Sequence, residues 1–100
     1  MEMWKGEYTI NGYTNIVKTE KLADNLFLEF GQRKNEDYQY ISLMQGNYKD
    51  PKKAKQLYFT HNIRGEWWVY DDSAINFVKK VGSKEEAIKL LKKLSKTIEI

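Results

Sequence analysis

QLYFTHNIRGEWWVY, residues 56–70, decides the predicted fold, because it contains two strand-like runs joined by a tight turn. Gly65 lies where the chain must reverse, and glycine enters the left-handed backbone region at little cost. We predict a three-residue loop, Ile63 to Gly65, in which a type I turn is followed by a left-handed glycine. A two-residue Arg64-Gly65 loop is the alternative, and it would slip the pairing by one residue.

The choice of loop determines which side chains share a face, since successive residues of a strand point to opposite sides of the sheet. The three-residue loop pairs Asn62 with Glu66 and His61 with Trp67. We favour it because it makes one face mostly apolar and the other polar and aromatic. The apolar set is then Leu57, Phe59, His61, Trp67 and Val69, and the opposite set is Tyr58, Thr60, Asn62, Glu66, Trp68 and Tyr70.

Other parts of the chain have the same two-residue periodicity. Asn11-Gly12 lies between two such runs and is a strong signal for a hairpin. Residues 75–81 fit either a strand or a helix, and we favour a strand. Residues 46–55 form the longest predicted loop, in which Pro51 can begin a short helical turn. The remaining predicted strands cover residues 3–10, 14–20, 26–30 and 38–45.

The last predicted element is an amphipathic helix. Ser83 followed by Glu86 is a capping box, which marks a helix start. Beyond it, Ala87, Leu91 and Leu94 recur on one side while lysines occupy the other. The sequence therefore predicts one α+β domain, residues 1–100, with an antiparallel β-meander of about six strands and this helix packed on one face. We expect the helix to cover Leu26, Leu28, Phe30, Ile41, Leu43, Leu57, Phe59 and Val69.

The composition argues against catalysis and against cofactors. There is no cysteine and only one histidine, so neither a disulfide nor a zinc site is expected. His61 falls on the predicted apolar face, where a histidine is more often a core residue than a general base. We expect a protein that is not an enzyme and carries no metal or cofactor. The sequence contains no membrane span or signal peptide pattern, and we expect a cytoplasmic location.

The predicted function depends on the uncovered face and on an uneven charge distribution. Basic residues concentrate in residues 49–64, which suits a polyanionic partner. Single-stranded nucleic acid stacks its bases on aromatic sheet faces, so we expect such a ligand. A protein partner, as for an adaptor, immunity protein or inhibitor, or a homodimer through the same face is the alternative. The candidate binding residues are Tyr38, Tyr40, Tyr58, Trp68, Tyr70, Lys49, Lys52, Lys53, Lys55 and Arg64.

Overall fold

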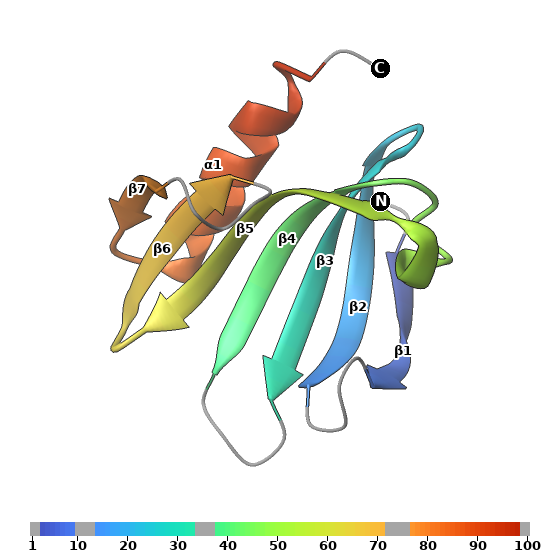
Figure 1. Cartoon of the computed structure of the whole chain (residues 1–100), viewed down its shortest axis with the longest axis horizontal. Coiled ribbons are helices and arrows are strands. Elements are labelled where there is room, and N and C mark those ends of the chain that lie inside the picture. The colour runs from blue at the N-terminus through green and yellow to red at the C-terminus, as the bar shows by residue number, and fades with distance from the viewer. Residues whose placement is uncertain (1–2, 10–13, 34–37, 72–76, 99–100) are drawn as a thin grey trace.

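In the part of the chain that the structure describes, seven antiparallel strands form one sheet in chain order, followed by a helix (Figure 1). The computed structural model describes residues 3–9, 14–33, 38–71 and 77–98. The predicted α+β meander with a C-terminal helix is confirmed. The hairpin turn predicted at Asn11-Gly12 falls outside the described residues. The elements are β1 (Met3–Thr9), β2 (Thr14–Ala23), β3 (Leu26–Arg33), β4 (Gln39–Gln45), η1 (Pro51–Lys53), β5 (Lys55–Ile63), β6 (Glu66–Asp71), β7 (Phe77–Val81) and α1 (Lys84–Ser95).

The hairpin of β5 and β6 has a two-residue turn, and Ile63 pairs with Glu66 across it. Both turn residues have left-handed backbones, with φ 52° at Arg64 and 85° at Gly65. A type I′ turn requires a positive φ at both positions, and its twist matches that of the flanking strands. The predicted three-residue loop is therefore wrong, because it placed a left-handed residue at Gly65 alone.

The one-residue change in register moves Phe59 and His61 away from the helix and brings Tyr58 and Thr60 to the helix side, while β6 keeps its predicted facing. Leu57 still packs against the core beneath α1 as predicted, because a bulge shifts the pairing of β4 and β5 between Leu43 and Met44. Thr60 now pairs with Val69, and His61 with Trp68. Phe59, predicted to lie beneath the helix, instead lies on the opposite side of the sheet, where its ring contacts His61.

The helix α1 begins as the capping box predicts. The Ser83 side chain accepts a 3.2 Å hydrogen bond from the backbone N–H of Glu86. The helix lies against β4, β5 and β6, and it buries Ala87 and Leu91 completely. Removing such side chains from water stabilises the fold by about 1.5–3 kcal/mol for each leucine-sized group. The core between helix and sheet consists of Leu28, Phe30, Ile41, Leu43, Trp67, Val69, Val81, Ala87 and Leu91.

The sheet face opposite α1, here called the helix-free face, is not bare along its whole width. Its β2–β4 part is sealed, because Phe27, Tyr40 and Ser42 are all buried there. Residues 46–54, which include η1, fold back toward this part, and the backbone carbonyl of Tyr48 accepts a 2.6 Å hydrogen bond from the Thr19 hydroxyl. The prediction of an uncovered face therefore holds only towards β5, β6 and β7.

Candidate functional site

Among the described residues, seven ring-bearing side chains are joined by ring contacts on the helix-free face. Phe59 and His61 come from β5, and their ring centroids are 5.0 Å apart. His61 also contacts Tyr70, which in turn contacts Phe77, with centroid distances of 5.6 and 5.8 Å. These contacts join three neighbouring strands into one surface. Tyr40 contacts Phe59 at 5.7 Å but is buried. The six rings that are at least partly exposed, here called the aromatic cluster, are Tyr38, Phe59, His61, Trp68, Tyr70 and Phe77.

Strand alternation and pairing place these rings together. Phe59 and His61 are two residues apart on β5, and they pair directly with Tyr70 and Trp68 of β6. Phe77 of β7 pairs with Tyr70. Rings at directly paired positions on one face lie close enough to touch, which stabilises the sheet even without a ligand. The cluster is thus a consequence of the two-residue turn, which brings both strands' rings to the same side.

His61 is at the centre of the aromatic cluster. Its Nδ1 lies 3.0 Å from the hydroxyl of Tyr38, and the two rings meet edge to face. Burial lowers the pKa of His61, because the imidazolium loses hydration there. The neutral ring is therefore favoured, and its tautomer decides whether Nδ1 accepts from or donates to the Tyr38 hydroxyl. The Nε2 atom is buried and has no hydrogen-bond partner among the described residues.

Cationic side chains lie over rings at both ends of the aromatic cluster. The Nζ of Lys80 is 5.6 Å from the centroid of the Trp68 ring, and it also forms a 3.0 Å ion pair with Glu66. At the other end, the guanidinium carbon of Arg33 is 4.6 Å from the Tyr38 ring centroid. Cations in these positions are attracted by the negative faces of the rings. They place one cationic side chain at each end of the cluster, and that of Lys80 is paired with Glu66.

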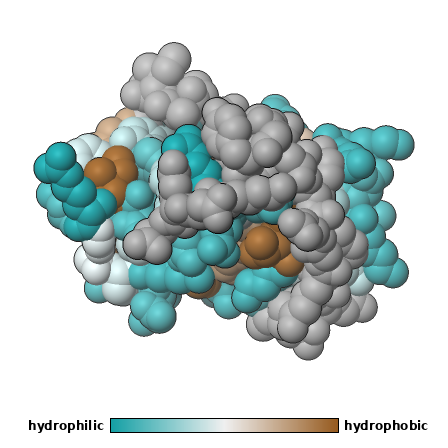
Figure 2. Space-filling model, turned by 90° about the horizontal axis from the view of Figure 1, so that it is seen from below, coloured by the Kyte–Doolittle hydropathy of each residue, from teal (hydrophilic) through white to brown (hydrophobic). Residues whose placement is uncertain are grey.

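The degree of exposure varies along the cluster. Phe77 is 52% exposed, which is unusual for a phenylalanine, and its neighbour Val78 is 43% exposed. Trp68 and Tyr70 are half-buried. Seen from below relative to Figure 1, hydrophobic atoms reach the surface as separate patches among hydrophilic and grey atoms (Figure 2). The accessible part of the cluster is therefore at β7.

The structure divides the predicted tyrosines and tryptophan into three groups. Tyr38, Trp68 and Tyr70 lie in the aromatic cluster. Tyr40 is on the helix-free face but only 6% exposed, with its hydroxyl bonded to Glu29. Tyr58 packs against the core beneath α1, so its predicted place beside Trp68 is wrong. The cause is the register of β5, which the two-residue turn shifts.

The predicted basic residues lie at the two ends of β5. Lys49, Lys52 and Lys53 precede the strand and are exposed, and Lys53 approaches Asp50 at 3.9 Å. Lys55 opens the strand, whereas Arg64 is exposed in the turn at its far end. The aromatic cluster occupies the second half of β5, so the lysines of residues 49–55 are not part of it.

Sequence reasoning missed Phe59, His61 and Phe77 as members of the site. The first two were assigned to the wrong face by the predicted register of β5. Phe77 lies in the run of residues 75–81 that fits a strand or a helix, and although it suits the favoured strand, the prediction assigned it to neither sheet face. The signal for Phe59 and His61 was the alternative Arg64-Gly65 loop, since that register brings them beside Trp68 and Tyr70.

The described part of the chain contains neither a metal-binding cluster nor a membrane-spanning helix. No three histidine or acidic side chains there come together as a metal site. No described helix is both long enough and apolar enough to span a bilayer. The site that the described residues offer is an aromatic surface edged by cations.

Comparison with protein-family models, with curated proteins and with solved structures gave no match to this chain.

Proposed function

We propose that the protein binds single-stranded nucleic acid on the aromatic cluster. The observation that carries the proposal is the run of contacting rings from Tyr38 to Phe77, on a part of the sheet that α1 does not cover. Bases of any sequence have a flat face that stacks on such rings, and each stacked base contributes roughly 1–3 kcal/mol. The half-exposed ring of Phe77 is the most accessible position for the first base.

Cations beside the rings support the same ligand. Lys80 and Arg33 lie over the rings of Trp68 and Tyr38, at opposite ends of the cluster. Phosphate groups of a strand whose bases stack between them would lie within reach of these charges. The chain has two arginines, so bidentate recognition of guanine is a minor part of the proposal. Binding is accordingly expected to depend on salt and little on sequence.

Fluorescence anisotropy with labelled oligonucleotides at two salt concentrations tests the proposal. Phe77→Ala is the first variant, because an exposed ring can be removed with little damage to the fold. Loss of one stacked base predicts an affinity decrease of roughly 5- to 150-fold. Trp68→Ala should act in the same direction. Tyr58→Phe is the matched control, since it alters an aromatic residue on the helix side and should leave affinity unchanged.

Unchanged oligonucleotide affinity in a folded Phe77→Ala, Trp68→Ala double variant would remove the stacking proposal. Circular dichroism and thermal unfolding establish that the variants are folded. A wild-type affinity that does not fall with rising salt would also count against a nucleic acid, because phosphate contacts release counterions.

A protein partner is the second candidate, and the exposure of Phe77 and Val78 favours it. Both residues lie on β7, an edge strand whose outer backbone groups can pair with another strand. Sedimentation distinguishes a homodimer from a chain that binds a different protein. A mass twice that of the chain, reduced to the monomer by Phe77→Asp, would indicate a homodimer through β7. Aromatic protein interfaces also respond less to salt than phosphate contacts do.

A further inference from the structure

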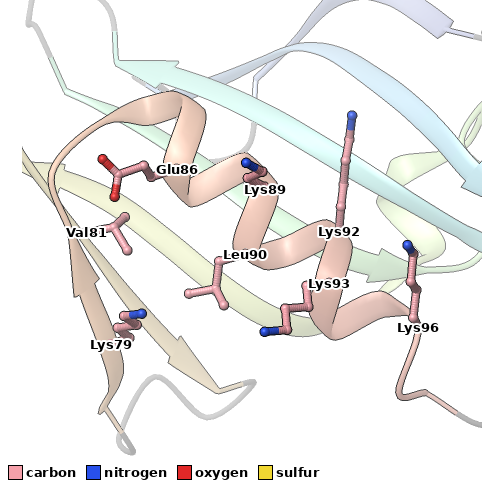
Figure 3. A pocket seen from close by; sticks show the side chains of 8 residues that line it. All are labelled: Lys79, Val81, Glu86, Lys89, Leu90, Lys92, Lys93 and Lys96. Atoms are coloured by element: carbon pink, nitrogen blue, oxygen red, sulfur yellow. The ribbon is translucent and has the colours of Figure 1, made fainter.

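We infer that the sugar-phosphate backbone of the bound strand continues around the β7 edge into a lysine-lined groove between β7 and α1. This inference rests on the proposed function and extends it to a second surface. The groove has a volume of about 630 Å³ and lies on the helix side of the sheet (Figure 3). Its described lining contains one acidic residue and five lysines: Lys79, Val81, Glu86, Lys89, Leu90, Lys92, Lys93 and Lys96.

Adjacent lysines of β7 connect the two surfaces. Lys80 pairs with Trp68 on the helix-free face, whereas Lys79 pairs with Val69 and lines the groove on the helix side. Strand alternation therefore places one cation on each side of the same edge. Because β7 is the last strand of the sheet that the described residues form, none of the described strands separates the aromatic cluster from the groove. A flexible strand can pass over this edge with a lysine on either side of it.

The chemistry of the groove suits a polyanionic backbone. Figure 3 shows Lys93 of α1 and Lys79 of β7 extending toward each other, with Leu90 near the gap between them and Val81 closer to Glu86. Lys92 points elsewhere, and its Nζ is 3.5 Å from a carboxylate oxygen of Glu20. The groove floor is apolar but its rim is cationic, so the charge complementarity is with a chain of phosphates. Lysines act there as point charges, which matches recognition without reading of bases.

The length of the oligonucleotide provides the test. Oligothymidylates of about 4 and about 12 nucleotides cover the smallest and larger site sizes of single-strand binding domains. The wild-type protein is expected to bind the longer oligonucleotide more tightly than the shorter one, because only the longer one reaches from the aromatic cluster into the groove. The groove variant Lys79→Gln, Lys89→Gln, Lys93→Gln should lose that gain, on the order of tenfold at low salt. It should also lower the salt slope for the longer oligonucleotide by about 2, while binding of the short one persists.

A second variant with the same net charge distinguishes the effect of the groove lysines on affinity from the effect of total charge. Lys49→Gln, Lys52→Gln, Lys53→Gln removes the same three charges at the start of β5, and it should keep the length-dependent gain. Equal losses in the two variants, or no gain with length in the wild type, would overturn the inference and leave the stacking proposal standing. Failure of both oligonucleotides to bind would overturn both. Binding of polyglutamate in the groove without oligonucleotide binding would identify an acidic protein partner instead.

Discussion

The hydroxyl of Tyr40 donates a 2.9 Å hydrogen bond to a carboxylate oxygen of Glu29, and both residues are buried on the helix-free face. Burial raises the pKa of Glu29 to about 7, because the carboxylate loses its hydration, while the hydrogen bond from Tyr40 opposes the shift. The carboxyl group therefore changes its charge near neutral pH inside the sealed part of the sheet. This gives the stability of the fold a pH dependence that can be measured.

Glu29→Gln should stabilise the protein above neutral pH. The folded-state pKa of about 7 exceeds the ordinary value of 4.5, so the folded state holds a proton that the unfolded state has released. Stability is consequently lost as pH rises from 4.5 to about 7, by about 3 kcal/mol in total. Glutamine keeps an acceptor for Tyr40 and cannot ionise. Urea unfolding of both proteins should show a gap that is large near pH 8 and closes towards pH 4.5.

Glu85→Gln is the control for that experiment, because it removes one negative charge from an exposed position of α1. Its unfolding free energy should follow that of the wild type across the pH range. The raised pKa of Glu29 would be contradicted if the unfolding free energy of the wild type did not fall relative to that of Glu29→Gln as pH rose.

His61→Gln should change the pH dependence in the opposite sense. Burial lowers the pKa of His61 from 6.5, so below that pH the unfolded state binds a proton that the folded state resists. The contribution of His61 to stability is therefore lost as pH falls from 6.5 towards the lowered value, and this contribution is constant above 6.5. The variant should lose this acid-side decrease but be less stable near pH 8, where the hydrogen bond with Tyr38 is missing. Thermal unfolding between pH 5 and pH 8 measures both effects. A variant with the wild-type pH profile would show that the imidazole is hydrated in the folded state.

The fold was predictable because its signals are local and repeated. The capping box at Ser83 and the apolar stripe through Ala87 and Leu91 fix α1 without knowledge of any other element. Alternation in β3 and β4 likewise placed Leu28 and Leu43 correctly in the core. Each of these patterns depends only on neighbouring residues of the same element.

The site was harder to predict because it depends on pairing between elements. Arg64 has a left-handed backbone, which arginine adopts far less readily than asparagine or glycine, so its place in a type I′ turn was not evident. One wrong residue in the loop then reversed the predicted facing of residues 58–61 of β5, including His61. The burial of Tyr40 could not be predicted from local sequence patterns either, because it depends on how residues 46–54 return toward the sheet.

Gly31→Ala should destabilise the protein, because the Tyr40 ring lies where the new Cβ would be. The ring cannot move away freely, since its hydroxyl is bonded to Glu29. Overpacking of this kind costs about 1–3 kcal/mol, which urea unfolding would detect. In a Tyr40→Ala background the same glycine substitution should cost much less. Equal costs in the two backgrounds would mean that the ring does not occupy this space.

Arg64→Asn should stabilise the protein, and this prediction tests the register on which the aromatic cluster depends. Arginine at φ 52° lies in the left-handed region, which costs L-residues about 1–2 kcal/mol, and asparagine tolerates it better. A gain of about 0.5–1 kcal/mol in urea unfolding is expected, with Arg64→Lys as the control that keeps the strain. Gly65→Ala should cost about 1–2 kcal/mol. No atom lies within 4 Å of its added Cβ, so this cost comes from the backbone alone. If Arg64→Asn gained nothing over Arg64→Lys while Gly65→Ala still destabilised, a positive φ would be needed at Gly65 only. That is the three-residue loop, and it would return Phe59 and His61 to the helix side.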